Sequence, residues 1–507
     1  MFEALQSVAH GFSLAMLPEN LMYAFIGSLL GTLVGVLPGL GPVTTIAVLL
    51  PITYQVGSPL GALIMLAAIY YGAMYGGSTT SILLKVPGEA ASVITCMDGY
   101  EMAKQGRAGP ALAIAAIGSF VAGTLAVVGL TLVGPMFARF AVQFGPPEYF
   151  ALAVFGLVLA STLSGGPPLR GLCMVFLGIL LGLVGLDTMT GDARFSFGVL
   201  ELTAGIGIVP LMMGIFGLGE ILHNLEQRGE ASLVTKKIGR IMPSKQDWKD
   251  SAGPIGRGSV LGFLLGLLPG GGAILGALLS YTVEKSLSKK PETFGKGNIA
   301  GVAGPESANN SAASAAFIPL LTLGIPGNAV TAVLLAALLI QNIEPGPLML
   351  VQHADVFWGV IASMYVGNIM LLILNLPLVG LWVQLLRVPF WVLTPIILVI
   401  AVLGAYSLRN AWFDVGVLAA GGVIGYVFRK AQIDAGPMIM AFILADLLDT
   451  SLRQGLLMGD GSPVIFFSRP MSAVILALSA LVLVVQILAW RRSAAMLGLV
   501  DTQKEAS

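Results

Sequence analysis

Long apolar segments run through almost the whole chain, and they constrain its fold more than any other feature. A helix needs about 20 mostly apolar residues to cross a bilayer. Segments of this kind begin near residues 21, 60, 109, 148, 170, 199, 258, 317, 355, 390, 411, 436 and 472. The runs are long and do not alternate with polar residues, so strands are not indicated. We predict an all-α polytopic membrane protein with about 11–14 transmembrane segments, several of them broken or re-entrant at Gly or Pro.

The composition supports this class and excludes others. Charged residues make up only 10% of the 507 residues and hydrophobic residues 56%, which is too few charges for the surface of a water-soluble enzyme. The 26 basic residues equal the 26 acidic ones, so no basic face is available for nucleic acid. Cys96 and Cys173 lie in apolar surroundings. We therefore expect neither a disulfide framework nor a metal site built on them.

One polar stretch, residues 226–257, divides the chain near its middle and holds seven basic residues. The positive-inside rule places it in the cytoplasm. We therefore divide the chain into a first membrane repeat (1–225), a basic cytoplasmic loop (226–257), a second membrane repeat (258–460), and a final transmembrane helix with a cytoplasmic tail (461–507).

The two halves share a series of landmarks in the same order, which indicates an internal duplication. Residues 35–41 (GVLPGLG) recur as 266–272 (GLLPGGG), and residues 85–89 (KVPGE) recur as 324–328 (GIPGN). Polar clusters lie between these landmarks, at 76–81 (GGSTTS) and 309–314 (NNSAAS). Gly109-Pro110 and Gly346-Pro347 follow, each before a long apolar span.

The charge bias of corresponding segments is opposite, and this pattern predicts inverted topology. Residues 1–84 contain no Lys or Arg, whereas the second half opens with the basic loop. Basic residues then follow the second landmark of the first half but are absent from 298–386. We expect the N-terminus in the periplasm and the C-terminus in the cytoplasm. The segment 258–283 has basic residues on both flanks, so we expect a helix broken at 268–272 that enters and leaves on one side.

Polar clusters beside breaks in two inverted halves indicate a transporter site, because freed backbone groups and half-helix N-termini can bind ions and carboxylates there. Hydroxyl, amide and carbonyl oxygens suit a coupling cation such as Na⁺. For each residue the alternative is a cap or a helix-packing contact. The candidates for substrate binding are Gly39, Gly41, Ser78, Thr79, Thr80, Asn309, Asn310, Ser311, Gly270 and Gly271, and those for the coupling ion are Ser81, Glu306, Ser314, Pro326 and Gly327.

The charged residues of the membrane repeats have different expected roles. Glu306 is a lone carboxylate in a charge-poor stretch, which is costly inside a membrane, so it could accept a proton or help to hold a cation. Lys85 and Glu89 flank Pro87-Gly88. They could bind substrate or pair with each other, but we expect them in water at a hairpin tip. Asp446, Asp449 and Arg453 are expected to form a local polar patch.

At these residues the sequence resembles the large membrane subunit of tripartite tricarboxylate transporters, the TctA family. The resemblance covers nearly the whole chain. It is most specific in the paired glycine-rich segments 31–45 and 262–276, in residues 70–81 (YYGAMYGGSTTS) and in residues 304–310 (GPESANN).

The resemblance implies partners, a location and a mechanism. Such proteins work in the bacterial inner membrane with a small membrane subunit (TctB-like) and a periplasmic solute-binding protein (TctC-like). The binding protein delivers a carboxylate, citrate-like in the type case, and an Na⁺ or H⁺ gradient drives uptake. No cofactor is implied beyond a coupling Na⁺. We expect alternating access around a broken-helix site, with an elevator-like motion as an analogy only.

Three other classes remain as alternatives. The chain could be the membrane component of an ATP-driven uptake system whose ATPase is a separate chain, although broken inverted repeats favour a secondary carrier. An intramembrane serine protease would need Ser78 and a base such as His353, for which no orienting partner is evident. A channel usually builds its symmetry from several subunits, whereas this chain builds it internally.

Overall fold

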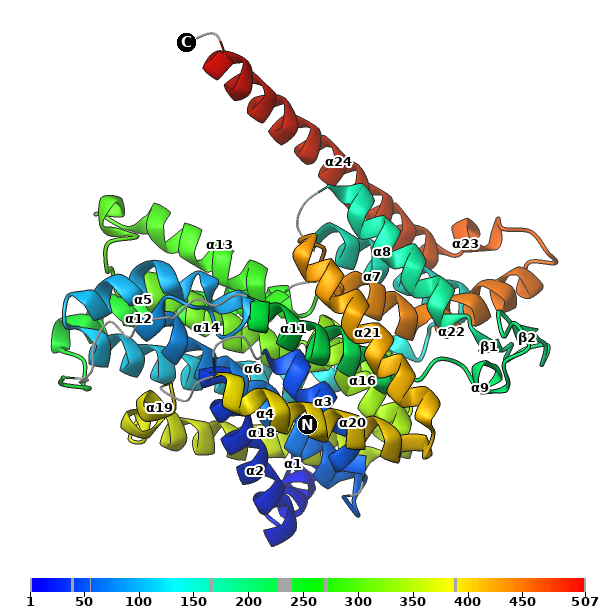
Figure 1. Cartoon of the computed structure of the whole chain (residues 1–507), viewed down its shortest axis with the longest axis horizontal. Coiled ribbons are helices and arrows are strands. Elements are labelled where there is room, and N and C mark those ends of the chain that lie inside the picture. Colours follow the sequence, from blue (N-terminus) through cyan, green and yellow to red (C-terminus); the bar gives the residue numbers. More distant parts are fainter. Residues whose placement is uncertain are drawn as a thin grey trace. The chain divides into compact units, whose positions relative to one another are not determined.

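The computed structural model of the chain is almost entirely helical (Figure 1). It describes residues 2–37, 41–54, 56–163, 167–226, 239–268, 272–386 and 390–505. Within these ranges the strands are β1 (Gly185–Leu186) and β2 (Ala193–Arg194), which form one short antiparallel hairpin. Seven helices in the described part of the chain are long and apolar enough to cross a membrane. The prediction of an all-α polytopic membrane protein is confirmed, while the exact number of spans stays a prediction.

Chain contacts divide the molecule into two compact units. Unit 1 contains residues 1–142 and 209–427, and unit 2 contains residues 143–208 and 428–507. The first stretch of unit 1 holds α1 (Phe2–Ala15), α2 (Pro18–Val36), α3 (Pro42–Tyr54), α4 (Pro59–Leu84), η1 (Ala90–Val93), α5 (Thr95–Lys104) and α6 (Ala108–Ala141).

The second stretch of unit 1 runs from α10 to α21. Its elements are α10 (Ile208–Met212), η2 (Met213–Leu218), α11 (Gly219–Glu226), α12 (Lys245–Gly266), α13 (Gly272–Leu287), η3 (Pro291–Thr293), α14 (Ala300–Ala315), α15 (Phe317–Leu323), α16 (Ala329–Ile340), α17 (Met349–Gln352), α18 (Ala354–Asn375), α19 (Val379–Leu385), α20 (Phe390–Arg409) and α21 (Trp412–Lys430).

Unit 2 is smaller and contains the β-hairpin. Its helices are α7 (Pro146–Leu163), α8 (Pro168–Gly182), α9 (Leu200–Thr203), α22 (Gly436–Met458), α23 (Ile465–Ser468) and α24 (Pro470–Glu505). Helix α22 packs against α7 and α8, and α24 packs against α7.

Both predicted breaks separate two helices. Helix α2 ends at Val36 and α3 begins at Pro42, while α12 ends at Gly266 and α13 begins at Gly272. A Cβ at Gly272 would lie 2.6 Å from the carbonyl oxygen of Leu265, so α13 folds back closely on the end of α12. Pro at the first helical position and Gly next to the break explain why the sequence stops and restarts a helix there.

The packing of α2 on α4 repeats in the packing of α12 on α14, and these are the most extensive helix contacts in the molecule. Glycines allow the close approach in both pairs. A Cβ at Gly35 would lie 2.4 Å from the carbonyl oxygen of Ala73, and a Cβ at Gly266 would lie 2.4 Å from that of Ala312. Gly35 therefore corresponds to Gly266, and Ala73 to Ala312.

The compact units cut across the sequence repeats, since each unit contains helices from both. In unit 2, α8 of the first repeat packs on α22 of the second, where Gly178 approaches the carbonyl oxygen of Met438. In unit 1, η2 of the first repeat packs on α21 of the second, where Gly214 approaches that of Leu418. The last part of each repeat thus packs with the other repeat. The division at residues 225, 257 and 460 stays a prediction about the duplication.

Three segments differ from the spans read from the sequence. The segment near 199 is a hairpin and the short α9, and the long helix begins only at Ile208. The segment near 317 breaks after Leu323, where Gly324 adopts φ 69°. The end of the basic stretch 226–257 is helical, because α12 begins at Lys245; residues 227–238 lie outside the described ranges.

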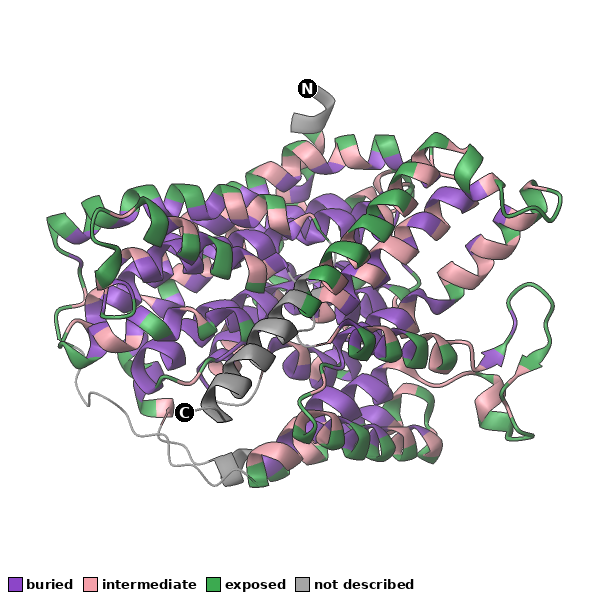
Figure 2. Cartoon of the chain, turned by 90° about the horizontal axis from the view of Figure 1, so that it is seen from above, coloured by how far each residue is buried: buried purple, intermediate pink, exposed green. Residues whose placement is uncertain are grey.

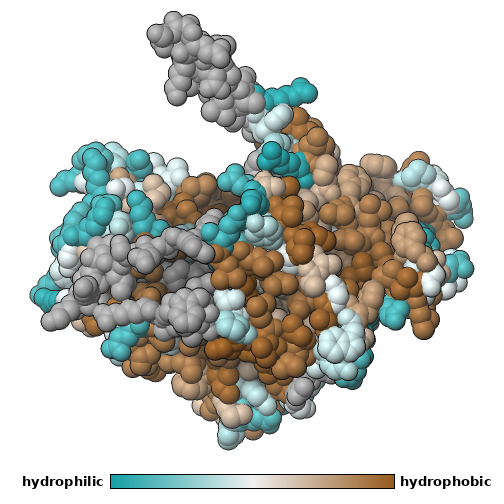
Figure 3. Space-filling model, in the orientation of Figure 1, coloured by the Kyte–Doolittle hydropathy of each residue, from teal (hydrophilic) through white to brown (hydrophobic). Residues whose placement is uncertain are grey.

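Burial and hydropathy support a membrane environment. Helix α4 is buried along its whole apolar window, whereas outer helices keep large apolar side chains exposed (Figure 2). Examples are Leu132 and Met136 on α6 and Ile369 and Ile373 on α18. Apolar side chains cover much of the face seen in Figure 3, and hydrophilic ones gather at its margins. Exposed apolar surface on this scale would be unstable in water.

Candidate functional site

Two equivalent loops in unit 1 form the frame of the site. One follows α4 and the other follows the short α15, which comes directly after α14. In each, the residue after the helix lies in the left-handed region, Lys85 at φ 60° and Gly324 at φ 69°. Each then passes through Pro-Gly and ends in a capping box, in which Glu89 and Asn328 cap the next helix. The correspondence therefore runs residue by residue from the αL position to the cap.

Each cap binds the long helix of the other repeat at an equivalent position. Asn309 Nδ2 on α14 donates to Glu89 Oε1 at 2.8 Å. Asn328 Nδ2 donates to the hydroxyl of Tyr70 on α4 at 3.1 Å. Because Tyr70 corresponds to Asn309 and Glu89 corresponds to Asn328, these two hydrogen bonds lie at equivalent positions of the two repeats.

Glu306 lies at the first of these contacts and is completely buried on α14. Ser78 Oγ on α4 donates to Glu306 Oε2 at 2.6 Å, and Thr95 Oγ1 at the start of α5 donates to Oε1. Glu306 lies three residues before Asn309 on α14, and Asn309 binds Glu89, so both carboxylates belong to this contact. We name this group of five residues, Glu89, Glu306, Ser78, Thr95 and Asn309, the acidic crossing.

The second contact has the same frame but neutral side chains. Tyr70 packs its ring on Phe317 of α15, with ring centroids 6.3 Å apart, and accepts the hydrogen bond from Asn328. We name Tyr70, Asn328 and Phe317 the neutral crossing. Pro326 and Gly327 lie in the loop that leads to it.

A small cavity lies where equivalent residues of α4 and α14 face each other. It is lined by Tyr71 and Asn310, which correspond, and by Tyr75 and Ser314, which also correspond. Its volume of about 10 Å³ is room for about one water molecule. The Tyr71 hydroxyl is buried without a hydrogen-bond partner.

Residues of α6 and α18 make hydrogen bonds with the polar side chains that line this cavity. Tyr75 donates to Asn368 Oδ1 at 2.6 Å, and Asn310 Nδ2 donates to Ser119 Oγ at 2.7 Å. Asn368 in turn donates to the carbonyl oxygen of Phe120 at 2.9 Å. The cavity therefore joins both repeats and is the point where a polar ligand could contact each of them.

The predicted site residues separate into groups. Ser78, Glu306, Asn309, Asn310 and Ser314 lie at the acidic crossing or the small cavity. The other described candidates lie in other contacts of unit 1. Ser311 donates to the carbonyl oxygen of Ser259 and Thr80 to that of Gly77, while Thr79 and Ser81 are buried on α4. Gly41 precedes α3, and Gly39, Gly270 and Gly271 lie outside the described residues.

The two polar clusters are not at equivalent positions, although the sequence pattern had suggested it. The correspondence of Ala73 with Ala312 aligns Asn309 and Asn310 with Tyr70 and Tyr71, and it aligns Ser78 with Phe317. The clusters therefore lie at different levels of equivalent helices. This difference brings Ser78 to Glu306.

Sequence reasoning missed Thr95, Tyr70 and Asn328 as site residues, and it considered Glu89 as a substrate ligand but favoured a place in water. Glu89 is not in water at a hairpin tip as expected, because it is buried and bonded to Asn309. Lys85 is exposed as expected. The alignment of Glu89 with Asn328 at equivalent caps was the signal in the sequence that could have found both. The protease alternative gains no support, since Ser78 is bonded to Glu306 rather than to a histidine.

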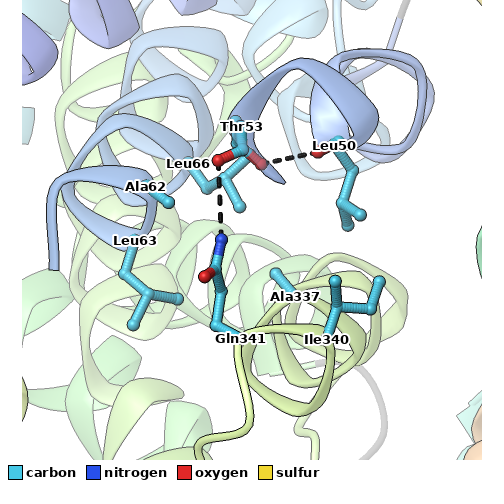
Figure 4. A pocket seen from close by; sticks show the side chains of 8 residues that line it. All are labelled: Leu50, Thr53, Ala62, Leu63, Leu66, Ala337, Ile340 and Gln341. Atoms are coloured by element: carbon cyan, nitrogen blue, oxygen red, sulfur yellow. Dashed lines mark hydrogen bonds between the residues drawn. The ribbon is translucent and has the colours of Figure 1, made fainter. Parts of the chain in front are cut away.

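A third contact between the repeats is apolar and closed (Figure 4). Side chains of α3, α4 and α16 surround it, and Gln341 Nε2 donates to the carbonyl oxygen of Thr53 at 3.5 Å. The space between these side chains has no room for a water molecule. This contact joins the end of α3 to the end of α16, and it has no room for a ligand.

In unit 2, the predicted polar patch is an ion network. Arg453 bonds Asp449 at 3.1 Å and Asp187 at 2.8 Å, and Arg194 also bonds both carboxylates. Asp446 accepts a bond from Thr188. The backbone N–H of Met189, together with the two arginines, holds the pKa of Asp187 below its usual value. Such a network stabilises the hairpin on α22 and keeps its charges fixed.

Comparisons with known proteins match most of the chain. The family model of the tripartite tricarboxylate transporter TctA family matches residues 21–440. The chain is 47% identical over 493 residues to an uncharacterised 52.8 kDa protein of the TAR-I ttuC′ 3′ region of Agrobacterium vitis, covering 97% of this chain and 98% of that protein. It is 46% identical over 232 residues to a protein of the TAR-II ttuC′ 3′ region of the same organism, covering 46% of this chain and 96% of that protein. No solved structure matches the chain.

Proposed function

The chain belongs to the tripartite tricarboxylate transporter TctA family, and we propose that it is the large membrane subunit of a binding-protein-dependent secondary transporter that imports di- or tricarboxylates. The proposed partners are a small TctB-like membrane subunit and a periplasmic TctC-like binding protein. The proposed location is the bacterial inner membrane, with a periplasmic N-terminus and a cytoplasmic C-terminus. An Na⁺ or H⁺ gradient would supply the energy.

The observation that carries this proposal is the buried carboxylate of Glu306 at a contact between the two repeats. Its hydroxyl donor Ser78 comes from the first repeat, whereas Glu306 itself comes from the second. A carboxylate held inside a membrane is expensive and is usually functional. Because the bond crosses the repeats, the charge state of Glu306 can influence how they pack.

The mechanism follows from charge. A dicarboxylate or tricarboxylate cannot cross hydrocarbon bare, so a co-transported cation must offset part of its charge. Broken helices supply backbone N–H groups and positive dipole ends for a carboxylate group. The small cavity joins residues of both repeats, so motion of one part against the other would open it alternately to either side.

The test is uptake into proteoliposomes that hold this chain and its small partner, with the binding protein added outside. Radiolabelled citrate and succinate are supplied under an Na⁺ gradient or a pH gradient, imposed separately and without ATP. The expected result is accumulation that requires the binding protein and one gradient, and that an ionophore collapses. Accumulation only with enclosed ATP and an added ATPase would replace the proposal with an ATP-driven system.

A further inference from the structure

The two crossings share one backbone frame but differ at every functional position. At five equivalent positions the acidic crossing has a polar or acidic side chain, and at four of them its counterpart is neutral and non-hydroxylic. The equivalent pairs are Glu89 with Asn328, Glu306 with Ala67, Ser78 with Phe317, Thr95 with Leu334, and Asn309 with Tyr70. A backbone frame of this kind needs only the caps and the glycines, so the fold does not require the polar side chains of the acidic crossing.

The acidic crossing has hydrogen-bonding capacity that its fold does not use. Asn309 is 1% exposed, and its Nδ2 is bonded to Glu89 while its Oδ1 has no partner. A buried carbonyl oxygen left without a donor costs free energy. The acidic crossing thus contains two carboxylates and one amide oxygen without a donor, all of which can serve as oxygen ligands.

The charge of the acidic crossing is also incomplete. The donors that the structure shows to Glu306 are two hydroxyls, and those to Glu89 are an amide and the backbone N–H of Ala91. No Lys or Arg contacts either carboxylate within the described part of the chain. Lys85, on the same loop, places its Nζ over the ring of Tyr100 at 5.4 Å.

Two buried carboxylates that repel one another need one positive charge to become stable. We propose that one monovalent cation, a proton or Na⁺, is held between Glu89 and Glu306 and is the coupling ion. The neutral crossing has no such role. This inference rests on the proposed function and assigns the ion to one of two geometrically equivalent places.

The position of the cation links binding to the packing of the repeats. Glu89 belongs to a loop of the first repeat and Glu306 to α14 of the second, and Asn309 already joins them. With the cation bound, the two carboxylates attract one ion; without it, they repel each other across the contact. Loss of the cation therefore weakens the acidic crossing and leaves the neutral crossing unchanged.

The test separates coupling from transport by comparing net accumulation with exchange. Wild type, Glu306→Gln and Glu89→Gln are reconstituted with both partners, and radiolabelled citrate is followed. Exchange of labelled for unlabelled citrate at equal concentrations requires no net ion movement. We expect both variants to keep exchange but to lose accumulation, so that the inside-to-outside citrate ratio falls to about one.

The matched control is Glu148→Gln, which removes a buried carboxylate of unit 2 that is paired with Arg469. All rates are expressed per folded complex, so a stability defect does not mimic a coupling defect. We expect Glu148→Gln to keep both accumulation and exchange. The separate Na⁺ and pH gradients identify which cation the wild type uses.

Three results would overturn the inference. Gradient-driven accumulation in Glu306→Gln would show that the ion is held elsewhere. Loss of exchange together with accumulation in folded Glu306→Gln would assign the residue to substrate binding instead. Equal uncoupling in Glu148→Gln would show a non-specific effect. Failure of the wild type under every gradient would instead overturn the proposed function and this inference with it.

Discussion

The buried carboxylates of unit 2 and those of the acidic crossing have opposite surroundings. In unit 2, Glu148 is bonded to Arg469 at 2.7 Å and Asp187 is bonded to two arginines. At the acidic crossing, the partners of Glu306 and Glu89 are hydroxyls, an amide and one backbone N–H. A guanidinium fixes the charge of its partner permanently. Neutral donors leave the charge free to be offset by a mobile cation.

Asp98 of unit 1 shows that the absence of arginine alone does not make a coupling site. It is completely buried, but the backbone N–H groups of Gly295, Gly297 and Asn298 all donate to it. These backbone donors and the hydroxyl of Tyr281 together supply hydrogen bonds to both of its carboxylate oxygens. The acidic crossing differs because it has two carboxylates and fewer donors for each.

We expect the largest difference in mutational effect between the two loops at their Pro-Gly glycines, Gly88 and Gly327. A Cβ at Gly88 would lie 2.4 Å from Gly77 Cα and 2.5 Å from the carbonyl oxygen of Gly35, whereas one at Gly327 would lie 3.4 Å from Ala316 Cβ. We expect Gly88→Ala to lower stability by about 3 kcal/mol, the upper end of the cost of overpacking. Gly327→Ala, the matched control, should change it little. The measurement is the thermal unfolding midpoint of each purified complex, and equal midpoints would contradict the expected asymmetry.

The contrast between the buried carboxylates of the two units is tested by two substitutions, one that removes a guanidinium partner and one that removes a carboxylate. Arg469→Ala leaves Glu148 buried and unpaired, which should cost about 2 kcal/mol, less than breaking a fully buried pair because the guanidinium is partly exposed. Glu306→Gln removes one of two repelling charges, so its unfolding midpoint should equal or exceed that of wild type. Thermal melts of both variants measure this, and a large destabilisation by Glu306→Gln would place Glu306 among the structural carboxylates.

The neutral crossing is tested by Tyr70→Phe, which removes the hydroxyl that accepts from Asn328. We expect a loss of about 1 kcal/mol, the net value of a typical hydrogen bond. It should appear as reduced stability or weaker citrate exchange. The ratio of accumulation to exchange should stay at the wild-type value. A change in that ratio would show that the neutral crossing also takes part in coupling.

Lowering the pH should destabilise the ion network of unit 2, whereas a bound proton should stabilise the acidic crossing. Because the pKa of Asp187 is lowered in the folded protein, its charged form contributes stability above its ordinary pKa, and this contribution is lost as pH falls through the lowered value. Asp187→Asn should remove that part of the acid sensitivity. Hydrogen exchange of residues 185–194 between pH 5 and 3 measures it, and an unchanged acid profile in the variant would refute the assignment.

The sequence predicted those parts of the fold that depend on local patterns. Long apolar runs identified the helical membrane class, and the Pro-Gly landmarks identified both breaks and the loop at 85–89. The break after Leu323 was not predicted, because the apolar run continues through it and only Gly324 marks the αL position. The hairpin near 185–194 was also missed, because its two strands are too short to produce alternation.

The site was only partly predictable because its contacts are distant in sequence. Glu306 stood out as an isolated carboxylate, but its partners Ser78 and Thr95 lie far along the chain on other elements. The charge of Glu89 looked solvated, since a Pro-Gly loop usually lies at a surface. The register of α4 against α14 depends on glycine contacts between helices, which a pattern of polar clusters does not reveal.

The most direct test of cation binding at the acidic crossing needs no substrate. The thermal unfolding midpoint of the purified complex is measured while Na⁺ replaces K⁺ at constant ionic strength, and again while pH is varied at constant Na⁺. Wild type should be stabilised by Na⁺ or by a proton, and Glu306→Gln should lose that response while Glu148→Gln keeps it. An identical response in wild type and Glu306→Gln would contradict the assignment of the coupling ion to Glu89 and Glu306.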